Sequence, residues 1–236
     1  MKQFSCFLVF LTILICLGCG DSEQPLKVSL EQPESLPAGP EIPAPAYLRL
    51  AVASVISPEE SYKYYDEMIE YIAENLHRSI RVVQRESYRE INDLMQLGKI
   101  DVAFVCSGAY IQGKDEFGME LLAAPQINGE TVYYSYLIIP SSSPANKLED
   151  LKGTRFAFTD PLSNTGCLSP RYILLTQMNE TPDHFFKEIK FTYSHDTSIK
   201  AVAQEKVDGA SVDNLVYDYF KKTNPDLINK TKIINI

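Results

Sequence analysis

The sequence predicts an α/β fold built as two lobes. Short apolar runs at residues 47–54, 80–83 and 102–105 alternate with two stretches of helical spacing, an order typical of a parallel sheet covered by helices. A second unit with the same alternation begins near residue 155. Two such units indicate a cleft between them, although the sequence shows no repeat of fixed period.

Start signals define the helices of the first unit. Ser57-Pro58-Glu59-Glu60 combines a capping box with proline at the first helical position, and a second helix is expected over residues 88–97. Ligands of parallel sheets lie beyond the carboxyl ends of the strands. Tyr88, Ser107 and Tyr110 lie just past such ends and are therefore candidate ligand contacts.

The stretch Thr159–Cys167 (TDPLSNTGC) connects a predicted strand at residues 155–158 with a following helix. Its run Ser163-Asn164-Thr165 places three hydrogen-bonding side chains where a helix presents unpaired N–H groups and the positive end of its dipole. Such a helix start can bind an anion. The alternative is a loop in which Ser163 or Thr165 only caps the helix.

The rest of the second unit alternates in the same way. Connecting segments at 121–124 and 132–139 have a strand-like pattern. Further elements are expected as strands at 189–193, 210–212 and 232–236 and as helices at 196–205 and 215–222.

The amino terminus indicates export. Residues 1–18 have a basic start and an apolar core of signal-peptide length, and they end at Gly18-Cys19, which resembles a bacterial lipoprotein cleavage site. Cys19 would then carry the lipid; the alternative is ordinary signal cleavage nearby. Residues 19–45 are polar and rich in proline, a composition typical of an extended tether.

Composition excludes one class of partner. The 236 residues carry a formal net charge of −9 and no basic run, which argues against nucleic acid. An anionic small ligand stays compatible with this balance, because local donors rather than net charge define a buried site.

Five short motifs follow one another from about Leu48 to the end. They are Lys99–Phe104 (KIDVAF), Leu148–Gly153 (LEDLKG) followed by Phe156–Phe158 (FAF), Asp160–Gly166 (DPLSNTG), Ser194–Asp196 (SHD) and Lys206–Ala210 (KVDGA). In this order they resemble the phosphate, phosphite and phosphonate substrate-binding proteins of bacterial ABC importers. The resemblance implies a two-lobe periplasmic-binding-protein type II fold with a ligand cleft, no cofactor and no enzymatic activity.

The resemblance also implies roles and boundaries. Ser163, Asn164 and Thr165 correspond to the residues that bind the phosphorus oxyanion, although the family's middle threonine is Asn164 here. Tyr88, Tyr133 and His195 correspond to residues that reach the ligand, and Ser107 and Tyr110 match more loosely. Residues 46–128 would form lobe 1, residues 129–213 lobe 2, and residues 214–236 the start of a return to lobe 1, which is expected to be incomplete at its C-terminal end.

Each of these residues also has a purely structural interpretation. His195 could be an ordinary helix-start residue, or it could donate to a phosphoryl oxygen, more strongly when protonated. Tyr88 and Tyr133 could be amphipathic residues at the edge of the core. Asp213 is the one candidate partner for a ligand ammonium group, and it could equally cap the helix that starts at Leu215.

The cysteines and the missing sequence motifs argue against a disulfide and against a metal site. Cys106 and Cys167 follow strand ends in different lobes, so we expect free, partly buried thiols rather than a disulfide. A nucleophilic Cys167 would need a base, for which His195 is the candidate. HExxH and GxSxG motifs do not occur, and residues 20–236 contain no CxxC motif, so no metal site is predicted.

Three functional hypotheses follow. The first is a lipid-anchored binding protein that faces the periplasm or cell exterior, captures a small phosphorus oxyanion and hands it to an ABC permease. The second is a sensory or accessory lipoprotein that reports the same kind of ligand to a signalling partner. The third is an enzyme that uses Cys167 and His195.

Overall fold

The computed structural model describes residues 47–127 and 129–235. The signal peptide, the tether and the lipidated Cys19 lie outside the described residues, so these stay predictions. Among the described helices, none is both long enough and apolar enough to span a bilayer.

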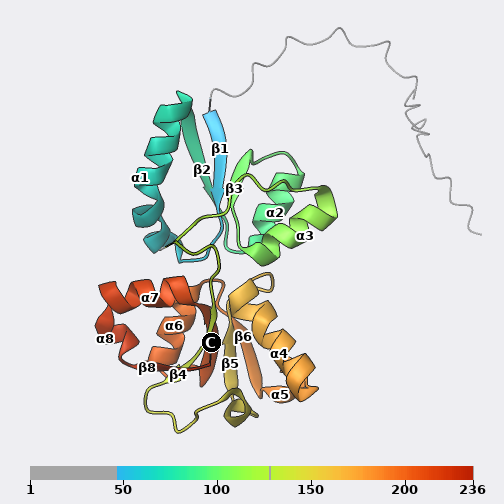
Figure 1. Ribbon diagram of the computed structural model, residues 1–236, viewed down its shortest axis with the longest axis vertical. Coiled ribbons are helices and arrows are strands. Elements are labelled where there is room, and N and C mark those ends of the chain that lie inside the picture. The colour runs from blue at the N-terminus through green and yellow to red at the C-terminus, as the bar shows by residue number, and fades with distance from the viewer. Residues whose placement is uncertain (1–46, 128, 236) are drawn as a thin grey trace, which may run out of the picture. The chain divides into compact units, whose positions relative to one another are not determined.

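The first sheet has three parallel strands in the order β2-β1-β3 (Figure 1). The strands are β1 (Tyr47–Val52), β2 (Ser79–Gln84) and β3 (Val102–Phe104), and the helices are α1 (Pro58–Leu76), α2 (Tyr88–Gln96) and α3 (Ser107–Phe117). Each helix starts just after a strand, as the alternating pattern predicts. The predicted residues 121–124 form no strand, and Leu122 is 77% exposed.

The second sheet has five strands in the order β6-β5-β7-β4-β8, with β4 antiparallel to both neighbours. Its elements are β4 (Ser135–Pro140), β5 (Arg155–Phe158), β6 (Glu188–Phe191), β7 (Gly209–Asp213), β8 (Thr231–Asn235), α4 (Ser169–Met178), α5 (Pro182–Phe185), α6 (His195–Ala203), α7 (Asn214–Thr223), α8 (Pro225–Ile228), the 3₁₀ turn η1 (Leu148–Leu151) and the π turn η2 (Asn164–Leu168). The α/β class and the two-sheet arrangement confirm the predicted fold.

The segment after β7 differs from the expectation that it begins a return to the first lobe. Its strand β8 pairs with β4, from Thr231 beside Pro140 to Asn235 beside Leu137. Ile228 in α8 and Phe220 in α7 are buried in the same cluster as Ile138. Backbone pairing and apolar burial therefore place residues 214–235 on the second sheet.

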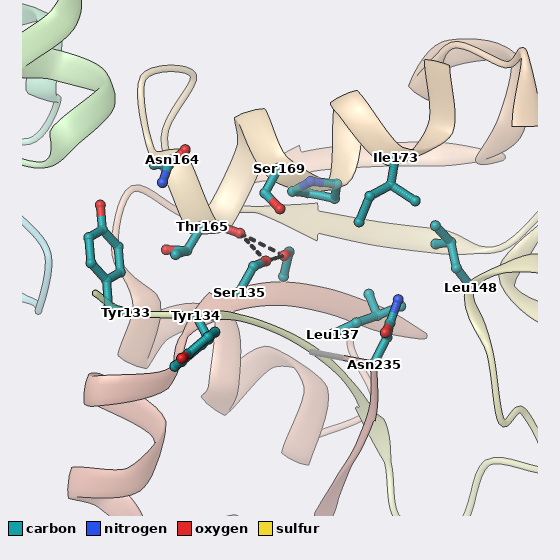
Figure 2. A pocket seen from close by; sticks show the side chains of 12 residues that line it. Tyr133, Tyr134, Ser135, Leu137, Leu148, Asn164, Thr165, Ser169, Ile173 and Asn235 are labelled. Carbon is teal, nitrogen blue, oxygen red and sulfur yellow. Dashed lines mark hydrogen bonds between the residues drawn. The ribbon is translucent and has the colours of Figure 1, made fainter. Parts of the chain in front are cut away.

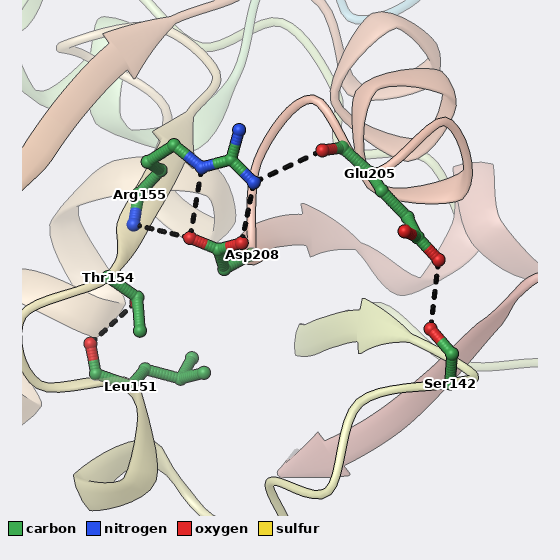
Figure 3. Close-up of polar contacts among 6 residues, drawn as sticks. All are labelled: Ser142, Leu151, Thr154, Arg155, Glu205 and Asp208. Carbon is green, nitrogen blue, oxygen red and sulfur yellow. Dashed lines mark hydrogen bonds and ion pairs between the residues drawn. The ribbon is translucent and has the colours of Figure 1, made fainter.

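An ion pair of the same design joins two neighbouring parallel strands in each sheet. In the first sheet, the backbone N–H and Nε of Arg49 both donate to Oδ2 of Asp101, at 2.8 and 3.0 Å, and the N–H of Asp101 donates to the carbonyl of Arg49. Arg155 and Asp208 repeat these contacts in the second sheet, with N–H and Nε distances of 2.8 and 3.1 Å (Figure 3).

These two ion pairs show that the lobes share one substructure. In each lobe the arginine lies on the middle of three parallel strands, and the aspartate precedes the third of them. The motifs KIDVAF and KVDGA thus have the same structural role, because each supplies the aspartate that binds the arginine of the neighbouring strand. The sequence showed no repeat because the equivalence lies in backbone pairing and in this one charged contact, not in a shared run of residues.

Cap formation differs from the expectation at one helix. Ser57 makes no side-chain cap at the start of α1, and its N–H donates to Asp196 of the other lobe instead, at 2.8 Å. A capping box forms at α2, where Ser87 and Glu90 satisfy each other's backbone N–H groups. The carboxylate of Asp196, far away in the sequence, thus accepts the Ser57 N–H that Glu60 would accept in a capping box.

We predict that Asp101→Asn and Asp208→Asn each lower the midpoint of urea unfolding at pH 7. The arginine lowers the pKa of Asp101 to about 2 from 3.8 and also lowers the pKa of Asp208. A lowered folded-state pKa adds stability above the unfolded value, and this is lost as pH falls. The difference from wild type should therefore shrink below about pH 4.

Exposed Asp115 offers a matched control, since it lies outside both ion pairs. Asp115→Asn should leave the midpoint close to that of the wild type. Unchanged midpoints at pH 7 in both ion-pair variants would contradict the proposed role in fixing the strands.

Candidate functional site

Tyr88 and His195 occupy equivalent positions in the two lobes. Each is the first residue of a helix, α2 or α6, and each follows an N-cap serine, Ser87 or Ser194. Both side chains are essentially buried, with exposures of 0% and 1%. Each lobe therefore contributes one polar ring to the site, from the first residue of the equivalent helix.

Each of these helices begins against a loop of the opposite lobe. The N–H of Tyr88 donates to Oδ2 of Asp160, in the loop after β5, at 3.0 Å. The N–H of His195 donates to the carbonyl of Val55, in the loop after β1, also at 3.0 Å. The first N–H groups of a helix have no partner within the helix, so these contacts satisfy them and hold both rings in place.

The loop after β5 is built as predicted, from a strand into a helix start. Ser163 Oγ accepts the N–H of Gly166 at 3.0 Å. Ser163 therefore caps the helix start, which was the structural alternative to anion binding. Gly166 lies so close to Thr159 that a Cβ atom would be 1.7 Å from Thr159 Oγ1. This position therefore requires glycine, and its close approach tightens the turn that presents Ser163 to Thr165.

His195 is a neutral ring, so any hydrogen bond that it donates lacks the extra strength that protonation would give. Its Nδ1 accepts the N–H of Asp213 at 2.9 Å, so in the neutral ring the proton is on Nε2. Nε2 lies 3.5 Å from Ser163 Oγ. Burial lowers the pKa of His195 to about 3 against a weaker opposing effect of Asp196, so the ring stays neutral at physiological pH.

Asp213 acts as a helix cap, the second of its two interpretations. Its Oδ1 accepts the N–H of Leu215 at 2.8 Å, and its Oδ2 lies 3.5 Å from Thr165 Oγ1. Burial raises the pKa of Asp213 to about 6 although these contacts oppose the shift. The carboxylate thus contacts the start of α7 and Thr165 of the segment Ser163–Thr165, which is called the anion loop below for its predicted role.

A second group of contacts joins the lobes at α3. Tyr133 Oη lies 2.5 Å from Ser107 Oγ and 3.7 Å from Cys106 Sγ. The N–H of Asn164 donates to the same sulfur at 3.4 Å. Burial raises the pKa of Tyr133 to about 12, so its hydroxyl keeps its proton. Sulfur is a weak acceptor, and an oxyanion would accept these donors more strongly.

The Tyr88 hydroxyl is buried and has no hydrogen-bond partner among the described residues. An unpaired buried hydroxyl costs roughly 1–3 kcal/mol, so such a group in a native site calls for an explanation. Burial, the largest cause, and the nearby Cys106, Asp160, Asp213 and Tyr133 raise its pKa well above the usual range. Tyr88 is therefore a protonated donor at the meeting point of the two lobes.

The structure brings eight of the nine predicted ligand residues into this network. Tyr110 is half-buried on α3, and among the described residues no hydrogen bond joins its side chain to the other eight. Sequence reasoning missed Asp160, Asp196 and Cys106 as parts of the site. The motifs contain both aspartates, but their partners, Tyr88 and Ser57, lie 72 and 139 residues away.

The structure gives the cysteines no catalytic arrangement. Cys106 and Cys167 are free thiols, as predicted. Cys167 is fully buried, and burial raises its pKa, which disfavours the nucleophilic thiolate. Within residues 47–127 and 129–235, no group of three or more His, Cys, Asp or Glu side chains could hold a metal ion.

We predict that nitrogen-15 NMR will find the His195 ring as the Nε2–H tautomer, without titration between pH 5 and 8. The N–H of Asp213 and burial together disfavour a proton on Nδ1. His77 and His184 are internal references because both are exposed. A His195 signal that titrates near pH 6.5 would contradict the lowered pKa and the neutral ring.

Comparison with known proteins places this geometry in a family. The sequence model described as "ABC transporter, phosphonate, periplasmic substrate-binding protein" matches residues 50–236. The phosphonates-binding periplasmic protein of Escherichia coli is 24% identical over 192 residues, and the phosphate-import protein PhnD of Mycolicibacterium smegmatis is 25% identical over 213 residues. The matches cover 79% and 86% of this chain but only 56% and 63% of those relatives.

Solved structures show the same fold. A binding protein component of an ABC phosphonate transporter from Pseudomonas aeruginosa aligns with a TM-score of 0.73 and 22% identity, covering 80% of this chain and 64% of that one. PhnD1 from Prochlorococcus marinus, in complex with methylphosphonate, aligns with a TM-score of 0.73 and 18% identity, covering 81% and 72%. The chain therefore belongs to the family of periplasmic substrate-binding proteins of phosphonate ABC transporters.

Proposed function

We propose that this chain captures a small phosphorus oxyanion between its two lobes and delivers it to an ABC importer. The observation that carries the proposal is the set of neutral, buried donors that converge on the loop after β5. They comprise the hydroxyls of Tyr88, Ser163 and Thr165, the Nε2–H of His195 and the start of η2. Family membership and the ligands named for the relatives support the same class of ligand.

The chemistry of binding follows from these donors. Hydrogen bonds to a charged group contribute roughly 1.5–3 kcal/mol each, so three or four can hold a desolvated anion. These neutral donors can bind the anion without a cationic side chain. The helix start adds its partial positive charge. Ligand contacts from both Tyr88 and His195 would join the lobes, so binding would favour closure by hinge motion.

We predict that the double variant Ser163→Ala, Thr165→Ala weakens binding of methylphosphonate by a few kcal/mol. Both hydroxyls belong to the loop that would carry the anion, and each hydrogen bond to a charged group contributes roughly 1.5–3 kcal/mol. Isothermal titration of the full chain with phosphate, phosphite, methylphosphonate and sulfate measures the effect. Thr176→Ala is the control, because Thr176 is exposed on α4 and bonds only within that helix.

A thermal melt of each variant separates lost binding from lost folding. Equal affinity of the double variant and the wild type would make the loop an ordinary helix cap. Failure of the wild-type chain to bind any of the four anions would contradict the proposed function itself.

We also propose that the protein is exported and held at the membrane by lipid on Cys19. The apolar segment before Gly18-Cys19 and the proline-rich run behind it support this anchor. The tether would give the binding lobes reach, at about 3.1 Å per residue in extended geometry. A permease in the same membrane would then receive the ligand.

We predict that Cys19→Ser moves the protein from the membrane fraction to the soluble fraction, because the variant lacks the acylated thiol. Cell fractionation with immunoblotting measures the change. Cys6→Ser is the matched control, since it alters a cysteine that would leave with the signal peptide and lies away from the cleavage junction. Membrane association that survives Cys19→Ser would reject the lipid anchor.

A further inference from the structure

A pocket of about 290 Å³ opens beside the anion loop and shares three residues with the candidate site (Figure 2). Tyr133, Asn164 and Thr165 lie at one end, while Leu137, Ile173 and Leu148 lie at the other together with the amide of Asn235. The pocket therefore runs from the proposed oxyanion contacts to an end lined mainly by aliphatic side chains. Its volume is at the small end of ligand pockets, enough for a short organic group.

The two serines on the sheet side of the pocket, Ser135 and Ser211, are already paired. Ser135 and Ser211 each donate to the carbonyl of Thr165 at 2.7 Å, and their hydroxyls lie 2.8 Å apart. None of the buried polar atoms that lack a partner in the described structure belongs to a residue of this pocket. An apolar group can thus lie against Ser135 and Ser211 without leaving either hydroxyl unpaired.

The pocket also lacks a charge that could recognise a cation. None of its described lining residues is acidic or basic. Asp213, the nearest sequence candidate for an ammonium partner, is outside the lining and binds Leu215 N–H at the start of α7. An ammonium group placed here would lose its hydration without gaining a counter-charge, which is strongly unfavourable.

We infer that this pocket receives an uncharged organic substituent on the bound oxyanion, so that the ligand is a phosphonate with a short neutral alkyl group. This inference rests on the proposed function, since it assumes that the oxyanion lies at Ser163 to Thr165. Free phosphate would leave the apolar end unused. An aminoalkyl phosphonate would place a charge in it.

Propylphosphonate and 2-aminoethylphosphonate form a matched pair for the test, because they have the same length and differ in a terminal methyl or ammonium group. We expect titration of the full chain to give tighter binding of propylphosphonate than of methylphosphonate, by about fourfold per added methylene. We expect 2-aminoethylphosphonate to bind at least tenfold more weakly than propylphosphonate.

Ser169→Asp places a carboxylate in the pocket at the first position of α4, where an acidic residue suits the helix. The variant should reduce or reverse the preference for propylphosphonate over 2-aminoethylphosphonate. Thr176→Asp, on the same helix but outside the pocket, should leave that preference unchanged.

Two results would overturn the inference while leaving the proposed function intact. One is binding of 2-aminoethylphosphonate as tight as that of propylphosphonate. The other is binding of propylphosphonate weaker than that of methylphosphonate. If the wild-type chain binds none of these compounds and no phosphate, the proposed function fails and this inference fails with it.

Discussion

The site depends on a reciprocal contact between helix starts and loops of opposite lobes. The first N–H of α2 donates to Asp160 of the second lobe, and the first N–H of α6 donates to Val55 of the first. A helix start must find acceptors outside the helix, and here each lobe supplies them to the other. The side chains of Tyr88 and His195 take their positions from this exchange, and the anion loop lies between them.

The buried carboxylates in this exchange show what holds it together. Asp160 is 1% exposed, and burial raises its pKa despite N–H donation from Tyr88 and Leu162. Asp196 is also buried, yet its pKa is lowered, since Lys200 and Ser57 outweigh the effect of burial. Both carboxylates sit at helix starts of the first lobe, where the dipole favours negative charge. Removal of either would leave N–H groups without an acceptor.

Local sequence patterns were sufficient to predict the parts of the fold that depend on local order. Strand and helix alternation, the turn at Ser163 to Thr165 and the free thiols follow from neighbouring residues. Three other features depend on contacts between distant segments, which no short pattern records. They are the hydrogen bond from Ser57 to Asp196, the pairing of β8 with β4 and the tautomer of His195. Residues 121–124 have strand composition but no strand partner in the described structure, so composition alone misled the prediction.

The two arginine–aspartate ion pairs lie at the amino ends of their strands, whereas the candidate site is formed by loops at the carboxyl ends. Each sheet therefore has its ion pair at one end of the strands and the candidate site at the other. Under the proposed function, substitutions among the loop residues would change anion recognition while the ion pairs hold strand register from the opposite end. A fold with this separation can acquire new ligands through point changes without first giving up its stability.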